Sequence, residues 1–309
     1  MSSLSLSAAP TSAPCALVTG ASGFIGARLT QRLLAQGWQV HLLLRPDSTS
    51  TALPPASTQL HIHRHDGSTE QLISIMRAAA PQAVFHLASL FLAQHQPADI
   101  AALVQSNLLL TTQLAEAMAQ CEVRLLLNTG TAWEHYENGA HNPVCLYAAT
   151  KSAATALLSY YTACHGLRVA NLKLFDTYGP GDTRPKLLNL LKRISLDGSS
   201  LAMSPGEQLI DLVYIDDVLD AYLCAWQRLA SGAQSAPMAD YGIASGAPIA
   251  LRQLASLYSQ VSGLPLAIEW GGRPYRPREV MQPWSNYPRL PGWQPRVSLA
   301  EGLARFHHG

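Results

Sequence analysis

The sequence predicts an α/β fold, a doubly wound parallel sheet with helices on both faces, followed by a smaller C-terminal lobe. Three observations lead to this prediction. Short apolar runs alternate with segments of helical periodicity through residues 15–178. The first apolar run leads directly into a glycine-rich turn that opens a helix. Beyond residue 179 the alternation becomes irregular, and residues 273–293 are rich in proline, arginine and aromatic side chains.

The individual elements follow from the period of the apolar residues. Short apolar runs predict strands at 15–19, 38–44, 61–65, 83–88, 123–128 and 169–174. Helical spacing predicts helices at 24–36, 100–119 and 147–164. Gly37 and Gly166 are predicted to end the first and third of these helices, because glycine readily adopts the left-handed conformation of a C-cap. Residues 211–214 and a helix from Asp217 are predicted to return to the sheet.

The composition allows a sizeable core and carries little net charge. The chain has 309 residues, 48% of them hydrophobic, and 21 basic residues nearly balance 20 acidic ones for a net charge of +1. This balance gives no reason to expect nucleic acid or an anionic membrane surface as a partner. Only 13% of the residues are charged, which favours a second subunit covering part of the surface. No run reaches the ~18 apolar residues of a membrane span.

Residues 1–14 and the cysteines indicate the compartment. Residues 1–14 carry no charged side chain and lack the features of a secretory signal, so we expect a flexible tail on a cytoplasmic protein. The five cysteines show neither a C-x-x-C pair nor metal-ligand spacing, a pattern typical of free thiols in a reducing compartment. His61, His63 and His65 alternate along a short strand, and we interpret them as a solvated edge. We therefore expect no metal site.

The glycine-rich turn is predicted to bind a dinucleotide. Gly20 allows the tight turn, Gly23 lets the backbone approach the pyrophosphate, and Gly26 allows the helix to pack closely on the strand. The free N–H groups at the helix N-terminus attract the anion. The residues of this turn expected to contact the cofactor are Gly20, Ser22, Gly23, Phe24, Ile25 and Gly26.

Two domains follow from this turn and from the change of pattern near residue 179. Residues 15–178 and about 211–246 are assigned to a dinucleotide-binding Rossmann domain. Residues about 179–210 and 247–309 are assigned to a substrate-binding lobe, whose basic groups we expect to face a phosphate.

The end of the second strand indicates which dinucleotide is used. NAD requires a carboxylate ~20 positions beyond the glycines, to bind the ribose 2′-hydroxyl. This zone holds Leu43, Leu44 and Arg45, with no carboxylate before Asp47. An arginine pairs instead with a 2′-phosphate. Arg45 therefore favours NADP(H), with NAD(H) as the alternative.

Tyr147 and Lys151 form a Tyr-x-x-x-Lys pair just beyond the fifth strand. Four positions apart on a helix, the two side chains lie on one face. An ammonium group lowers the pKa of a phenol from its free value near ~10, so Tyr147 is predicted to move a proton on a substrate oxygen. Thr129 and Thr131 end the fifth strand, where ligands bind in such sheets, and spacing does not decide which hydroxyl holds that oxygen. The pair indicates a nicotinamide-dependent enzyme acting on an alcohol or a ketone.

Together these residues resemble the extended short-chain dehydrogenase/reductase family, in its NAD(P)-dependent nucleotide-sugar epimerase/dehydratase branch. The resemblance covers the chain after residue 14 and includes the motifs at 86–89, 175–181, 211–217 and 276–279. It implies that Thr129 aligns best with the catalytic Ser/Thr, so that Tyr147, Lys151 and Thr129 are catalytic. The further cofactor contacts that it implies are Asp66 (at the adenine), Gly67, Leu87, Ala88, Asn107, Lys151 and Phe175. The substrate contacts that it implies are Ser89, Thr131, Asp176 and Arg276. It also implies a homodimer through the helices that carry Asn107 and Tyr147.

Departures from the family pattern narrow the reaction. The 4,6-dehydratases of the family follow the catalytic threonine with Asp-Glu, whereas Gly130 and Thr131 follow Thr129 here, so dehydration is not expected. The Cys or His pair of the 3,5-epimerising reductases is also missing. Lys173 and Ile210 replace arginines, and Asp176 replaces an asparagine, so the phosphate contacts must differ in part. Residues 128–151 are most similar to the 4-ketohexulose reductases that make CDP-3,6-dideoxyhexoses such as abequose or paratose.

These inferences predict an NADPH-dependent reductase of a nucleotide-activated 4-keto-6-deoxyhexose, with hydride transfer to sugar C4 and Tyr147 as proton donor. One alternative is a nucleotide-sugar C4 epimerase with tightly held NAD(H). Another is a nicotinamide-sensing regulator that has lost the chemistry. The sequence does not identify the nucleotide base, the sugar or the stereochemistry at C4.

Overall fold

A seven-stranded sheet forms the centre of the computed structural model, which describes residues 13–48 and 53–309. The strand order is β11-β6-β5-β4-β1-β2-β3, and every neighbouring pair is parallel. The strands are β1 Cys15–Thr19, β2 Gln39–Leu44, β3 Leu60–Arg64, β4 Ala83–His86, β5 Leu125–Thr131, β6 Arg168–Leu174 and β11 Met238–Ile243. The predicted doubly wound fold is confirmed. Residues 1–12 of the predicted tail lie outside the described residues.

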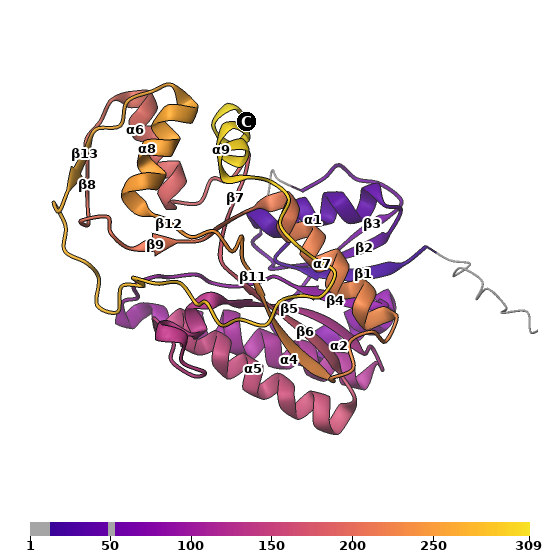
Figure 1. The fold of residues 1–309 in the computed structure, drawn as a ribbon. Coiled ribbons are helices and arrows are strands. Elements are labelled where there is room, and N and C mark those ends of the chain that lie inside the picture. The colour runs from indigo at the N-terminus through magenta and orange to yellow at the C-terminus, as the bar shows by residue number, and fades with distance from the viewer. Residues whose placement is uncertain (1–12, 49–52) are drawn as a thin grey trace, which may run out of the picture.

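Helices cover both faces of the sheet (Figure 1). One face carries α1 (Phe24–Ala35) and α7 (Ile215–Ala230). The other carries α2 (Thr69–Ala79), α4 (Leu110–Gln120) and α5 (Leu146–His165). The strand order reverses at β1, which pairs with both β2 and β4. In such sheets the ligand crevice lies at the carboxyl ends of the strands beside this point.

Two helical segments differ from the prediction. Helix α2 was not predicted, although Ser68 caps its N-terminus and its buried residues recur at helical spacing. The predicted helix at 100–119 is divided into α3 (Ile100–Val104), a π-helical turn η2 (Gln105–Leu109) and α4. Such π-turns are frequent at functional sites, and this one contains Asn107.

The smaller lobe joins the sheet where β6 ends. The chain passes from β6 into β7 (Asp176–Tyr178), which pairs with β10 (Leu212–Tyr214). The prediction that residues 211–214 return to the central sheet is wrong, because β10 pairs with β7 in a separate two-stranded sheet. Helix α7 packs on the central sheet and β11 joins it. The other elements of the lobe are α6 Leu187–Asp197, β8 Leu201–Met203, β9 Leu209–Ile210, β12 Ile249–Ala250, α8 Leu251–Ser262, β13 Ile268–Trp270 and α9 Leu299–His308.

One apolar core extends from the sheet into the lobe. Leu29 of α1 and Val40 of β2 belong to one buried cluster. The same cluster contains side chains of the lobe helices, namely Leu191, Tyr258 and Phe306. Burial of apolar surface thus holds the two parts together. Among the residues that the structure describes, no helix is long and apolar enough to cross a membrane.

Candidate active site

The glycine turn lies against the loop that follows β4. Gly20 has φ +71°, and a Cβ there would lie 2.5 Å from the backbone nitrogen of Ala88. A Cβ at Gly26 would lie 2.2 Å from the Gly20 carbonyl oxygen, so this position requires glycine for packing. The Gly23 amide donates to that same oxygen (3.0 Å), and Gly23 is the N-cap of α1. With no acidic residue in its first turn, α1 presents its free N–H groups at the crevice, an arrangement that fits a pyrophosphate.

The predicted adenosine end of the site is formed by the loops after β2 and β3. The Arg45 side chain is 83% exposed, and Arg64 donates to the carbonyl groups of Arg45 and Pro46, which shapes the loop that carries Arg45. The Asp66 carboxylate accepts from the Ser68 amide (2.8 Å) and hydroxyl (2.7 Å), and these bonds lower the pKa of Asp66. Both side chains are accessible where a ribose and a base would lie.

A buried chain of hydrogen bonds supports the crevice from below. The Thr111 hydroxyl donates to the Asn107 carbonyl (2.9 Å), so it accepts from Nε2–H of His86 (2.9 Å). Nδ1 of His86 then accepts from the Thr19 hydroxyl (2.7 Å), which itself accepts from the Ala88 amide (3.1 Å). Burial lowers the pKa of His86 to about 3, in agreement with this neutral tautomer.

Asn107 uses its whole side chain on protein partners. Its Oδ1 accepts from the Leu90 amide (2.8 Å) and the Ser89 hydroxyl (3.1 Å). Its Nδ2 donates to the Leu90 carbonyl (3.0 Å) and the Thr150 hydroxyl (3.0 Å). Its amide is therefore saturated, and Asn107 fixes the loop after β4 against α5, beside Lys151.

Tyr147 and Lys151 lie in the first two turns of α5 and are both buried. Burial lowers the pKa of Lys151 to about 8. The pKa of Tyr147 is raised, by burial first and by the Glu134 carboxylate next, so the lowering predicted from the Lys151 ammonium is not found. The nearby Ser89 and Thr131 hydroxyls oppose the rise.

The two threonines of β5 have different environments. The Thr129 hydroxyl donates to the His86 carbonyl (2.7 Å) and lies 2.5 Å from the Tyr222 hydroxyl of α7, which must then be the donor of that second bond. Its only proton is thus used inside the protein. The Thr131 hydroxyl accepts from the Trp133 amide (3.3 Å) and lies near enough to Tyr147 to lower the pKa of that phenol; among the described residues no carbonyl or carboxylate takes its proton. This geometry argues against the prediction that Thr129 holds the substrate oxygen and favours Thr131.

The predicted substrate residue Arg276 and two aromatic side chains that were not predicted lie together at the mouth of the site. Phe91 packs edge-on against Tyr147 (5.0 Å between ring centroids) and beside Trp133 (5.5 Å). Arg276 lies over Trp133 (5.7 Å) and is held by Glu279 through two hydrogen bonds. A cavity of about 240 Å³ opens here. Its lining includes His95, Trp133, Cys145, Arg276 and Arg278.

Two further predicted residues lie deeper in the lobe junction. Asp176 forms an ion pair with Lys186 (3.5 Å), whose ammonium also lies over the Phe91 ring (5.4 Å). Phe175 is buried and packs against Trp284 and Tyr287. Phe175 therefore belongs to the apolar core, and its predicted cofactor contact stays a prediction.

The sequence profile of the NAD dependent epimerase/dehydratase family matches residues 16–242. The chain belongs to this family. The predicted membership of the extended short-chain dehydrogenase/reductases is confirmed, and the chain is an enzyme of that type.

Relatives within the family span nearly the whole chain. The UDP-glucose 4-epimerase of Mycolicibacterium smegmatis is 26% identical, over 94% of this chain and 96% of its own. The CDP-abequose synthase of Salmonella muenchen is 24% identical, again over 94% and 96%. The structure of the UDP-glucose 4-epimerase of Thermotoga maritima has the same fold, with a TM-score of 0.83, 23% identity and coverage of 95% of this chain and 97% of its own.

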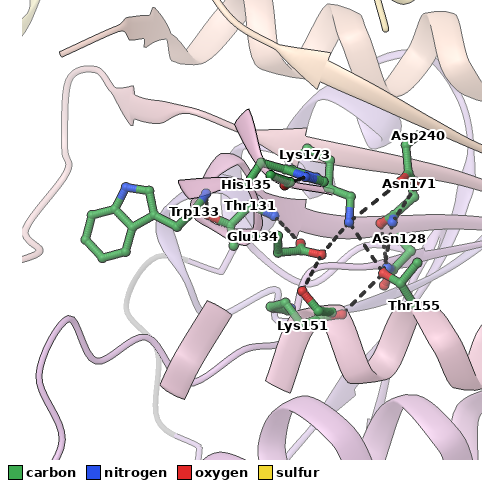
Figure 2. A network of polar contacts seen from close by, with 12 residues as sticks. Asn128, Thr131, Trp133, Glu134, His135, Lys151, Thr155, Asn171, Lys173 and Asp240 are labelled. Atoms are coloured by element: carbon green, nitrogen blue, oxygen red, sulfur yellow. Dashed lines mark hydrogen bonds and ion pairs between the residues drawn. The ribbon is translucent and has the colours of Figure 1, made fainter. Parts of the chain in front are cut away.

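The sequence predictions missed the residues behind the site. Glu134 and Lys173 form a buried ion pair, and Tyr222 closes off Thr129 (Figure 2 shows the ion pair). The run Thr131 to Glu134 has the S/T-x-x-E spacing of a capping box, and this signal identifies Glu134 as a partner of the Thr131 backbone. No local signal identifies Tyr222, because its contact with Thr129 is made 93 residues away.

Proposed function

We propose that this enzyme is an NADPH-dependent reductase of a nucleotide-activated 4-keto-6-deoxyhexose. The observation that carries the proposal is the arrangement of Tyr147, Lys151 and Thr131 at the carboxyl end of β5, with one hydroxyl proton free to bind a carbonyl oxygen. When bound, the reduced nicotinamide supplies a hydride to the sugar carbonyl carbon. The turn formed by Gly20, Gly23 and Gly26, at the N-terminus of α1, supports the binding of a dinucleotide at the carboxyl ends of the strands.

The side chains complete the reduction by holding the carbonyl oxygen and protonating it. Thr131 donates a hydrogen bond to the carbonyl oxygen and stabilises the negative charge that develops there. Tyr147 then transfers its proton to that oxygen, which gives the alcohol, and Lys151 stabilises the phenolate that remains. A raised pKa keeps Tyr147 protonated before the reaction, as a proton donor requires. Solvent restores the proton.

The walls of the site favour a deoxygenated sugar. Phe91 and Trp133 place two aromatic rings beside Tyr147, and Leu90, Leu92 and Leu146 belong to the same apolar cluster. Such a wall leaves a sugar hydroxyl without a hydrogen-bond partner but accommodates a methyl or methylene group. If Thr131 is the hydroxyl donor, the two residues that follow it are Ala132 and Trp133, where the dehydratases have Asp and Glu. Neither side chain is an acid or a base, so dehydration is still not expected. The CDP-abequose synthase relative supports a CDP-linked dideoxyhexose pathway as the context.

Cofactor choice and subunit structure belong to the same proposal. Arg45 is exposed and pairs with Asp47 at 3.8 Å on the surface, and this weak pair leaves its guanidinium accessible to the 2′-phosphate of NADPH. The exposed apolar side chains Leu109, Leu157 and Tyr160, on η2 and α5, support a homodimer through these helices.

Two outcomes of one assay separate this proposal from the epimerase alternative, which the Mycolicibacterium relative favours. We would follow reduced-nicotinamide absorbance with NADPH and NADH in parallel, against CDP-, dTDP- and GDP-4-keto-6-deoxysugars. Oxidation of NADPH with one of them supports the reductase. Isomerisation of a plain nucleotide sugar by protein carrying bound NAD(H), without added cofactor, refutes it and establishes the epimerase.

A further inference from the structure

A buried ion pair lies directly behind the catalytic residues. Glu134, in the 3₁₀ turn η3 (Ala132–Glu134), and Lys173, in β6, place Oε2 and Nζ 2.5 Å apart, and both side chains are only 2% exposed. Thr155 and Asp240 approach the Lys173 ammonium from its other side, at 3.5 and 4.0 Å (Figure 2). An ion pair this deeply buried contributes little to stability against an apolar replacement. Its presence beside a reaction centre therefore points to another use.

Strand β5 makes room for the side chains of Glu134 and Lys173 by having a glycine, Gly130, beside them. Gly130 pairs with Lys173 in the sheet, and a Cβ at Gly130 would lie 2.6 Å from Cδ of Lys173 and 2.9 Å from Oε1 of Glu134. Any larger residue displaces one partner of the pair. Gly130 thus serves to admit the ion pair.

The Glu134 carboxylate connects the ion pair to the catalytic residues. Its Oε1 accepts from the Thr131 amide (2.9 Å), which fixes the backbone that carries the Thr131 hydroxyl. Its Oε2 accepts from the hydroxyl of Ser152 (3.3 Å), the residue after Lys151. One carboxylate therefore holds η3 and α5 together at the point where Thr131, Tyr147 and Lys151 meet.

The charge of Glu134 also acts on both proton-transfer groups. After burial, which lowers the pKa of Lys151, Glu134 raises it and Lys173 lowers it. The other titratable groups near Tyr147 and Lys151 are His86, Cys145 and Tyr222, and burial shifts the pKa of each toward its neutral form. His135, whose pKa burial lowers, and the Asp240 carboxylate lie beside the Glu134–Lys173 ion pair. Glu134 and Lys173 are the charges that act on Lys151 itself.

We propose that Glu134 is a positioning residue, which fixes the Thr131 backbone against α5 and places a buried negative charge beside Tyr147 and Lys151. Lys173 makes the burial of that carboxylate possible. Protons held on both groups favour the donation of a proton to a substrate oxygen, which is the direction that ketone reduction needs. This inference rests on the proposed roles of Tyr147, Lys151 and Thr131.

The test is the titration of Lys151 in the whole protein, without substrate or cofactor. The chain has only four lysines, so ¹³Cε-lysine labelling gives four resonances, each assigned by substituting one residue: Lys151, Lys173, Lys186 and Lys192. The Lys151 resonance is expected to titrate near pH 8. Glu134→Gln is expected to lower its midpoint, and Lys173→Met to raise it.

A double variant and a matched control complete the test. Glu134→Gln/Lys173→Met removes both charges of the buried pair. This double variant is therefore expected to fold even if a single variant, which leaves one charge unpaired, does not. Because Glu134 acts on Lys151 more strongly than Lys173 does, the double variant is expected to lower the midpoint, by less than Glu134→Gln alone. Glu116→Gln makes the same chemical change on a carboxylate that contacts Tyr161, at the other end of α5, and is expected to leave the midpoint unchanged.

Three results would overturn the inference: an unchanged midpoint in both Glu134 variants, a raised midpoint in the double variant, or shifts of the same sign in Glu134→Gln and Lys173→Met. A purely structural role gives the first of these. Failure of the proposed function is separate, because it appears as absence of ketosugar reduction by the wild type while the midpoints still move as expected. Where a ketosugar is reduced, Glu134→Gln is also expected to shift the alkaline limb of kcat to lower pH.

Discussion

The sharpest prediction compares Thr131→Val with Thr129→Val. Valine has nearly the shape of threonine but no hydroxyl, so each variant removes one hydrogen-bonding group with little change in packing. The two threonines are two residues apart on β5, and their hydroxyls have different partners. Thr129 donates to the buried His86 carbonyl, whereas we propose that Thr131 donates its proton to a substrate oxygen. We therefore expect one variant to lose turnover and the other to lose stability.

The magnitudes follow from the hydrogen bonds that each substitution breaks. Removing a single donor to a developing oxyanion costs about 10²–10³-fold in kcat. Thr131→Val is expected to show that loss, with a change in unfolding free energy of about 1 kcal/mol from the weakened cap of η3. Thr129→Val leaves the buried Tyr222 hydroxyl without its acceptor and removes the hydroxyl donor from the carbonyl of buried His86. Each unpaired buried group costs about 1–3 kcal/mol, with turnover expected to stay within a few-fold of the wild type.

The assay combines kcat with the ketosugar that the wild type reduces and urea unfolding of each variant. Thr129→Ser is the control, because it keeps the hydroxyl and its two bonds and should restore most of the stability lost in Thr129→Val. Loss of turnover in Thr129→Val together with an active Thr131→Val would refute the geometric reasoning and restore the assignment drawn from the family alignment.

Four further predictions concern the cofactor site and the proton donor. Tyr147→Phe removes the donor and should lower kcat about 10²–10⁴-fold, while the dinucleotide affinity measured by fluorescence titration stays unchanged; wild-type turnover would exclude this role. Because burial lowers the pKa of Lys151 to about 8, its charged form is lost as pH rises through that value, and kcat at saturating substrate should fall there; a profile that stays flat well above this pH contradicts the assignment. Arg45→Ala removes a charge-assisted bond and should weaken NADPH binding roughly 10–100-fold and NADH binding little, so equal losses for the two cofactors would speak against 2′-phosphate recognition. Gly26→Ala places a Cβ 2.2 Å from the Gly20 carbonyl oxygen, so we expect it to abolish dinucleotide binding and to lower the melting temperature. A variant that binds the dinucleotide normally would contradict the close packing of this turn.

Features set by short-range chemistry were predictable from the sequence. Strand β1 and the glycine turn follow one another in the chain, and the turn requires glycine for local reasons, such as the positive φ of Gly20. Tyr147 and Lys151 share a face because residues four apart on any α-helix do so. Gly166 ends α5 in the left-handed conformation, as the sequence predicts. The order of alternating strands and helices likewise restricts the topology to a doubly wound sheet.

What only the tertiary structure decided is how side chains from distant segments share hydrogen bonds. Thr129 and Thr131 both end one strand, and the choice between them depends on Tyr222, which α7 brings to Thr129 from 93 residues away. Glu134 and Lys173 are 39 residues apart, and neither shows locally that the other neutralises it. A hydroxyl has a single proton and a buried charge needs a partner, so their roles depend on which neighbours the fold supplies. The sequence by itself determined the family, the sheet topology and the glycine turn, and it predicted the Tyr147–Lys151 pair; packing decided which of the remaining polar groups are already used by protein partners.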